Sequence, residues 1–542
     1  MTAIVIVRLW LTTTLLMLAA SGALASTNAA QNDAPRFLIF HLDAVSAVDF
    51  DRAWDEGALP NLERAFEGGA RANASTLFFA ATPVIYPRMK TGESNAGPGN
   101  LTFGGFDREA ERPVPEVEVF LEHVESLPRR AVSNMASGVP LLDAAAGLAL
   151  MNVPDLLDRY GVVEYFWFAT DTYGHLLGEA AHRRSLERFD EYLGRLLPRL
   201  DLEQTNLILY ADHGITFARD MVDFEPVLQE RVGDQRRHFV YPNLYLRDPS
   251  LAPEVARALT HDGAVDFAFY RLDQERVHGY LNGAFVRFEV DGDGIRYLSD
   301  DDPLGYGHLG YEGEALTRDA WLTLTIDEYF PATPPNLFGY VQNPDAGDVV
   351  VGVIPPRTPL TVRAPAGAHA SIVQTDLVVP ILSRGPDVGP LAERSELWLF
   401  ELYQDLPIEF GMEPNRERHE LELWWRFDEL APGARLRLSP AYRLRLAGEA
   451  TPSSLSLWSE HDLVSGYLSR WWVGAGIDVR DAAVQPLARA ELELDLGHAR
   501  VRLEARVRPS GWTIGLGATF RVDGGLRISW SSPGAVGVAY HW

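Results

Sequence analysis

The sequence predicts an α/β fold, in which helices cover both faces of a mostly parallel sheet, followed by an antiparallel all-β domain. Over residues 36 to about 385, short apolar runs that end near an acidic residue alternate with segments of helical periodicity. This alternation is typical of a parallel sheet covered by helices on both faces. After about residue 390 the period changes to two residues, which indicates strands with one apolar face.

Four apolar runs are the predicted strands of the α/β domain, at residues 37–42, 162–169, 206–211 and 348–353. Asp43, Asp171 and Asp212 follow the first three runs. Between the runs, residues 60–66 begin like a helix, and residues 180–197 place apolar side chains at helical spacing. Ligands of open α/β sheets bind beyond the carboxyl ends of the strands, so these three carboxylates predict a site there.

The C-terminal region, residues 390–542, alternates in several stretches of roughly ten residues. One such stretch is Trp512, Ile514, Leu516, Ala518, Phe520 and Val522. Strands of that length with one apolar face predict a small barrel of about eight to ten strands in the outer membrane. The final Gly537, Tyr540 and Trp542 resemble the C-terminal signal of bacterial outer-membrane barrel proteins. A soluble antiparallel sandwich is the alternative, and Pro440 inside one strand favours it.

The N-terminus reads as a secretory signal peptide, residues 1–25. Arg8 precedes an apolar run, and Ala23-Leu24-Ala25 follows as an Ala-x-Ala cleavage site. A membrane anchor is the alternative, but the run is short and contains three threonines. We therefore expect an exported protein in the periplasm or outer membrane of a Gram-negative bacterium, with a catalytic domain at residues 33–388.

Composition narrows the function. With 542 residues, the chain is long enough for two or three domains. The formal net charge of -27 disfavours binding to a nucleic acid scaffold, because there is no basic surplus to neutralise phosphates. The absence of cysteine excludes a thiol nucleophile and a thiolate metal site.

Three short motifs carry candidate metal ligands. Asp171-Thr172-Tyr173-Gly174-His175 and Asp212-His213-Gly214 each follow a predicted strand, and His369 lies after the run at 348–353. Carboxylates and imidazoles both bind Zn²⁺ and similar divalent ions. Taken singly, the first motif could be a helix cap, the second a turn and the third a surface histidine. Occurring together at strand ends, they favour a metal site; His308 is a rival to His369 as the third imidazole.

In this order, Asp43, Asp171, His175, Asp212, His213 and His369 resemble the metal ligands of the alkaline-phosphatase superfamily. Residues 35–385 look most similar to its type I phosphodiesterase/nucleotide pyrophosphatase branch. The resemblance implies two divalent ions, Zn²⁺ or alternatively Mn²⁺. It assigns Asp171, His175 and His369 to one ion. Asp43, Asp212 and His213 hold the other, together with the nucleophile.

The resemblance also points to Thr82 as the nucleophile, nine residues before Thr91-Gly92 and at the start of a predicted helix. A hydroxyl on a divalent cation loses its proton near neutral pH, and a helix N-terminus favours phosphoryl charge. Thr82 could alternatively cap the helix. The branch usually has Asn where this chain has Ile85, so we expect the contact to a phosphoryl oxygen to come from a backbone N–H or from Arg88, Lys90, Asn95 or Asn100.

These features predict hydrolysis of a phosphomonoester or phosphodiester through a phospho-Thr82 intermediate. One alternative is a non-catalytic binding or assembly module of the outer membrane. Another is transfer of a phosphoryl-linked group to a lipid or glycan, which the same nucleophile permits. The expected partner is the phosphate-ester substrate, and the oligomeric state does not follow from the sequence.

Overall fold

The computed structural model divides into two compact units. One is Pro35–Gly411, and the other includes Met412–Trp542. Residues 35–408 are described apart from 98–99, 115–130, 135–149, 151–152, 155–156, 158–160, 218–219, 361–365, 370 and 405. In the second unit only the strand segments between 420 and 541 are described. The predicted signal peptide lies outside the described residues.

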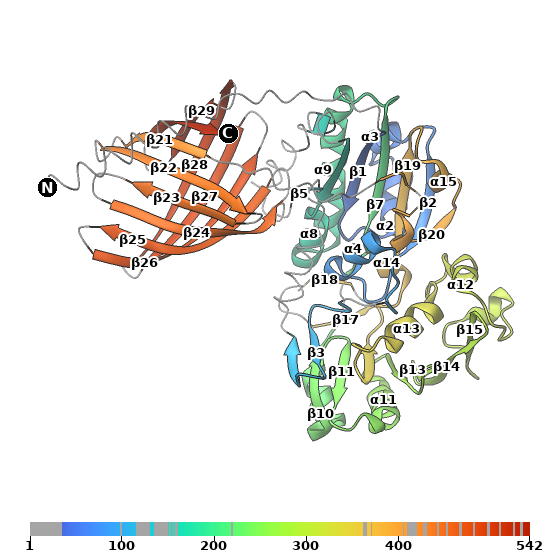
Figure 1. Cartoon of the computed structure of the whole chain (residues 1–542). Coiled ribbons are helices and arrows are strands. Elements are labelled where there is room, and N and C mark those ends of the chain that lie inside the picture. The colour runs from blue at the N-terminus through green and yellow to red at the C-terminus, as the bar shows by residue number, and fades with distance from the viewer. Residues whose placement is uncertain are drawn as a thin grey trace. The chain divides into compact units, whose positions relative to one another are not determined.

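A mixed, mainly parallel sheet forms the centre of the first unit (Figure 1). Its described strands run in the order β20-β2-β19-β7-β1-β6-β5. Their bounds are β1 Arg36–Leu42, β2 Ala70–Ser75, β5 Ala131–Asn134, β6 Val162–Trp167, β7 Thr205–Ala211, β19 Val378–Arg384 and β20 Glu396–Trp398. β1 is parallel to both β6 and β7, whereas β19 is antiparallel to β7 and β2. Because β20 pairs with β2, this unit extends beyond the predicted boundary at residue 388.

Helices cover both faces of this sheet, as the sequence predicts. Successive residues of β1 point to opposite faces. Phe40 meets Phe189 of α9 (Glu179–Leu196), with ring centroids 5.5 Å apart. His41, the next residue, stacks on Tyr86 of α4 (Thr82–Thr91) at 5.7 Å. α9 and α4 therefore lie on opposite sides of β1.

Two short helices follow β1. The hydroxyl of Ser46 accepts from Asp49 N–H and caps α2 (Ala47–Asp55). α3 (Pro60–Ala65) begins with proline, which suits the first helical turn. The Asp190 carboxylate of α9 accepts the Leu62 N–H at 2.7 Å and so holds the start of α3. The helix predicted at 60–66 is confirmed at this place.

A second, antiparallel sheet lies within the same unit, in the order β10-β11-β16-β12-β13-β14-β15 among the described residues. Its strands are β10 Arg236–Val240, β11 Asn243–Leu246, β12 Phe267–Arg271, β13 Arg276–Leu281, β14 Ala284–Asp291, β15 Gly294–Leu298 and β16 Val349–Gly352. The helices along this part of the chain are α10 Phe224–Arg231, α11 Ala252–Thr260, α12 Arg318–Thr325 and α13 Thr333–Gln342. A core that includes Leu228, Leu259 and Val351 fills the space between α10, α11 and this sheet.

The run at 348–353 was predicted as a strand of the parallel sheet, and this assignment is wrong. It forms β16, between β11 and β12 of the antiparallel sheet. All four residues of β16 are buried, and a run buried on both faces does not show by its periodicity which sheet it joins.

The described strands of the C-terminal unit are β21 Glu420–Arg426, β22 Ala431–Ala441, β23 Leu444–Ala450, β24 Ser454–Ser465, β25 Ser469–Arg480, β26 Ala483–Asp495, β27 Ala499–Arg508, β28 Gly511–Asp523, β29 Leu526–Ser531 and β30 Ala535–His541. Consecutive strands pair antiparallel, and β21 also pairs with β30. Pro440 falls at a register shift between β22 and β23, where a missing N–H is tolerated. The outer-membrane interpretation of this unit stays a prediction.

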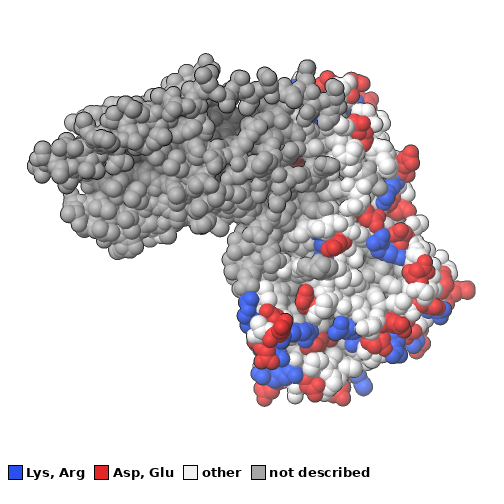
Figure 2. All heavy atoms as spheres, viewed as in Figure 1, with Lys and Arg blue, Asp and Glu red and all other residues white. Residues whose placement is uncertain are grey.

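No helix among the described residues is both long enough and apolar enough to cross a lipid bilayer. On the surface of the first unit, acidic and basic side chains are intermixed over the face shown in Figure 2.

Candidate active site

The three predicted carboxylates meet at the carboxyl edge of the parallel sheet. Asp43 follows β1 and Asp212 follows β7, which is hydrogen-bonded to β1 along its length. β6 lies on the other side of β1, and Asp171 comes four residues after its end, in the first turn of α8 (Ala169–Leu177). Asp171 is therefore a helix residue, and His175 lies one turn further along the same helix face.

Thr82 and His369 also contribute to the site, Thr82 from the start of a helix and His369 from a loop. Thr82 is the first residue of α4. His369 follows β18 (Gly367–Ala368), which pairs antiparallel with β8 (Thr216–Phe217). Since β8 comes shortly after His213, this pairing brings the two histidine loops together, and the two imidazole centroids lie 4.0 Å apart.

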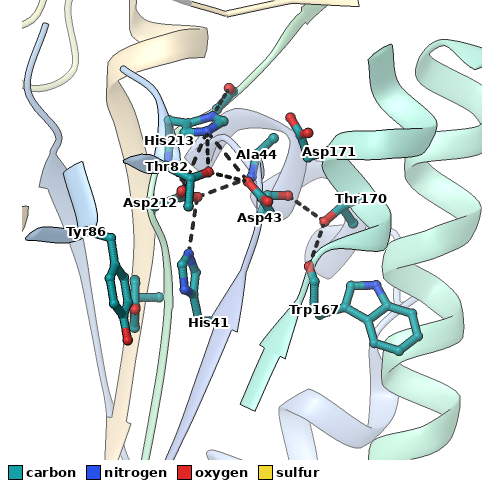
Figure 3. Close-up of polar contacts among 12 residues, drawn as sticks. His41, Asp43, Ala44, Thr82, Tyr86, Trp167, Thr170, Asp171, Asp212 and His213 are labelled. Atoms are coloured by element: carbon teal, nitrogen blue, oxygen red, sulfur yellow. Dashed lines mark hydrogen bonds and ion pairs between the residues drawn. The ribbon is translucent and has the colours of Figure 1, made fainter. Parts of the chain in front are cut away.

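Around Thr82, three side chains converge (Figure 3). Thr82 Oγ1 lies 3.3 Å from Asp43 Oδ1 and 3.3 Å from His213 Nε2. His213 Nε2 is 3.5 Å from both Asp43 Oδ1 and Asp212 Oδ2. The capping residue of α4 is Ala81, and no side chain caps the helix. The Thr82 hydroxyl thus faces the acidic cluster instead of capping its helix.

A second group surrounds Asp171. Its Oδ1 lies 3.0 Å from His175 Nε2 and 3.8 Å from His369 Nε2. The set Asp43, Asp212 and His213 and the set Asp171, His213 and His369 each have ligand atoms close enough for one ion. All six predicted ligands therefore converge with Thr82, and His213 borders both sets. His308 does not join them: its side chain is 60% exposed and pairs with Glu328.

The imidazoles of His175, His213 and His369 each turn Nδ1 toward the backbone and Nε2 toward the site. Each Nδ1 lies against a backbone carbonyl, at 2.7 Å from Gly367 for His175, 2.9 Å from Gly214 for His213, and 2.5 Å from Ala80 for His369. Because a carbonyl only accepts, Nδ1 carries the proton and Nε2 is left to face the carboxylates. Such a second partner is what fixes a metal-ligating histidine.

Three of the site carboxylates each have a buried oxygen atom that is available to bind a cation. Asp43 Oδ2, Asp171 Oδ1 and Asp212 Oδ2 are buried and receive no hydrogen bond from the described residues. Burial, with Asp212 and Asp171 nearby, raises the pKa of Asp43 well above its ordinary value. Burial also acts to raise the pKa of Asp212, but His213 and His41 more than offset it and lower that pKa. Buried carboxylates this close together call for compensating positive charge, and divalent ions supply it.

The predicted substrate contacts fare differently. The Arg88 guanidinium is buried and donates to the carbonyls of Ser94, Gly97 and Asn100, so it holds the loop after α4. The substrate contact expected for Arg88 stays a prediction. Asn100 enters this contact through its carbonyl. The side chain of Lys90 lies outside the described residues. For both, substrate contact stays a prediction.

Several supporting residues were not predicted from the sequence. Asp376 is buried and accepts from Thr216 Oγ1 at 2.6 Å and from Ser371 N–H at 2.7 Å. It thereby ties the loop after His213 to the loop after His369. Burial raises the pKa of Asp376 to about 6. In the sequence this aspartate has no spacing that sets it apart from surface acids; only the folded loops reveal its role.

This chain is similar to one known family over part of its length and to several solved structures. Residues 65–263 match the family described as type I phosphodiesterase / nucleotide pyrophosphatase. Among solved structures, phosphonoacetate hydrolase from Sinorhizobium meliloti 1021 is 17% identical, covers 70% of this chain and 98% of its own, and has a TM-score of 0.39. Human ectonucleotide pyrophosphatase / phosphodiesterase 5 is 14% identical, with 68% and 93% covered and a TM-score of 0.43. No curated protein matches.

The α/β domain with this cluster of aspartates and histidines is thus similar to the metal-dependent phosphoester hydrolases of the family that residues 65–263 match.

Proposed function

We propose that the protein hydrolyses phosphate monoesters or diesters through a phospho-Thr82 intermediate. The observation that carries this is the position of Thr82 Oγ1, 3.3 Å from both Asp43 and His213. Attack by Oγ1 on phosphorus forms the Thr82–phosphate bond and expels the alcohol of the substrate. Water then cleaves that bond, releases phosphate or its monoester, and restores the hydroxyl.

Two divalent ions, Zn²⁺ or Mn²⁺, complete this site. Asp43, Asp212 and His213 would hold one beside Thr82, and Asp171, His175 and His369 the other. The mixture of carboxylate oxygens and imidazole nitrogens suits Zn²⁺. When bound, the ions lower the pKa of the attacking hydroxyl and of water and neutralise charge on the phosphoryl oxygens.

The test compares Thr82→Ala with Thr91→Ala. Thr91 lies on the same helix, and its hydroxyl bonds only to Pro87 and Arg88 carbonyls among the described contacts. With aryl phosphate monoesters, diesters and phosphonates, Thr82→Ala should lose at least about 10³-fold in kcat. Thr91→Ala should keep wild-type activity, and both should bind two metal equivalents by elemental analysis. Undiminished turnover in Thr82→Ala refutes the assignment.

We also propose that the enzyme is exported and attached to the outer membrane by its C-terminal unit. The alternating strands and the terminal Tyr540 and Trp542 support this. The full chain should fractionate with outer membranes and show heat-dependent mobility on gels. Extraction by carbonate or urea would instead favour the soluble sandwich.

A further inference from the structure

A second set of buried polar side chains lies beneath the site, one structural repeat away from a site residue along each element. His41 comes two residues before Asp43 along β1, and Tyr210 two residues before Asp212 along β7. Tyr86 comes four residues after Thr82 along α4. Spacings of two along a strand and four along a helix keep side chains on one face. Asp43, Asp212 and Thr82 therefore each have a partner below them.

These three partners converge on Glu164, a buried carboxylate of β6 that the proposed reaction does not use. Tyr86 donates to Glu164 Oε2 at 2.5 Å, and Tyr210 donates to Oε1 at 2.5 Å. We call His41, Tyr86, Glu164 and Tyr210 the support layer. Burial, followed by the charge of Glu164, raises the pKa of both phenols well above 10, which keeps them protonated as donors.

His41 connects the support layer to the site itself. It pairs with Tyr210 in the parallel register of β1 and β7, and it stacks on Tyr210 at 4.6 Å and on Tyr86 at 5.7 Å. Its Nε2 lies 3.4 Å from Asp212 Oδ1 (Figure 3). Its Nδ1 faces Glu164 Oε1 at 4.0 Å. The two nitrogens of the His41 imidazole thus face two carboxylates, Asp212 in the site and Glu164 in the support layer.

We propose that Glu164 is a positioning residue, which acts through Tyr86 on the nucleophile helix and through Tyr210 and His41 on Asp212. This inference deepens the proposed function and rests on it. Because Tyr86 of α4 and Tyr210 of β7 both donate to this one carboxyl group, Glu164 sets α4 against β7. A displacement of about 1 Å at a reacting atom costs about 10²-fold in rate.

The chain offers a matched control. Tyr403 also donates to Glu164 Oε1, at 3.1 Å, and it is buried like the other two phenols. It belongs to the segment after a short 3-10 turn (Leu399–Glu401), which carries none of the predicted ligands or Thr82. Tyr403→Phe and Tyr86→Phe therefore each remove one phenol hydroxyl from the same carboxylate, but of the two only Tyr86 lies on the helix that carries Thr82.

The kinetic experiment compares these two variants in the full-length enzyme. If Glu164 positions the site, Tyr86→Phe lowers kcat at least about tenfold with KM within about twofold of wild type, because orientation and not binding is lost. Tyr403→Phe keeps the wild-type kcat, and both variants lower Tm. Equal kcat values for the two variants would show that Glu164 serves stability alone, and would overturn the proposal.

A second measurement does not depend on activity. His41→Phe keeps the ring stacking but removes the Nε2 contact to Asp212. Loss of such a partner typically weakens metal binding about 10- to 100-fold, which competition of Zn²⁺ with a chelator measures on the stripped protein. Wild-type affinity in His41→Phe would contradict the proposal. Since this readout needs no turnover, it stands even if Thr82→Ala proves active and the proposed function fails.

Discussion

Gly214, in the Asp212-His213-Gly214 motif, provides the sharpest structural prediction. A Cβ at this position would stand 1.9 Å from the Thr375 carbonyl oxygen and 2.8 Å from Ser46 Cβ. Real Cβ contacts essentially never fall below 3.0 Å, so Gly214→Ala must push the loop away by about 1 Å. The obstacle is backbone, which yields less readily than the end of a side chain. The loop must move, and His213 is the adjacent residue.

The expected cost has two parts. Overpacking of this kind destabilises a protein by about 1–3 kcal/mol. Moving His213, which lies 3.3 Å from the nucleophile hydroxyl, should also lower kcat about 10²-fold. Gly105→Ala is the control, because a Cβ there meets nothing nearer than 3.8 Å. Thermal melting measures the loss of stability in the two variants, and steady-state kinetics measures the loss of kcat. Wild-type kcat in a folded Gly214→Ala would refute the reasoning that this close approach fixes His213.

Three further predictions concern charge. Since the pKa of Asp376 is about 6 against 3.8 for the free side chain, the unfolded chain loses this proton first as pH rises. The Asp376 contribution to the free energy of unfolding should thus fall by up to about 3 kcal/mol between pH 4 and 6. In urea titrations over this pH range, the free energy of unfolding of Asp376→Asn should not show this decrease. Burial lowers the pKa of His175, but Asp171 more than offsets it and raises that pKa to about 9. Metal binding must then displace a proton from His175, so the heat of binding measured by calorimetry should depend on the buffer. The affinity for the metal ion should rise about tenfold per pH unit up to pH 9. Heats that do not depend on the buffer would contradict this. Finally, a chelator should lower Tm by exposing the mutual repulsion of Asp43, Asp171 and Asp212, and ions at about 100 times their Kd should restore about 2.7 kcal/mol.

The part of the site that the sequence predicts is the part set by local spacing. Asp171 and His175 are four residues apart, which puts them on one helix face wherever the helix packs. Asp43 and Asp212 follow strands, and parallel strands bring their carboxyl ends to the same edge. These relations hold for any order of the strands, so the ligands could be named without the topology.

The support layer depends on long-range information that spacing lacks. Glu164 meets Tyr86 only because β6 is parallel to β1 in one particular register and α4 covers that face. A shift of one residue would turn Glu164 to the opposite face, toward α9. The wrong assignment of residues 348–353 has a related cause, since the pattern showed a buried strand but not its neighbours.

The net charge of the site connects the hydrogen bonds of Arg88 with the predicted ions. The six ligands carry three negative charges, from Asp43, Asp171 and Asp212, because Nδ1 of each ligating histidine is the protonated nitrogen. Two divalent ions would leave the site with one net positive charge, enough to attract an anionic phosphoester without a cationic side chain. Arg88 is therefore available for structure, and its guanidinium binds three carbonyls in the loop after α4. On this account, selectivity between esters depends on what surrounds the phosphoryl group, and the charge that binds it comes from the ions.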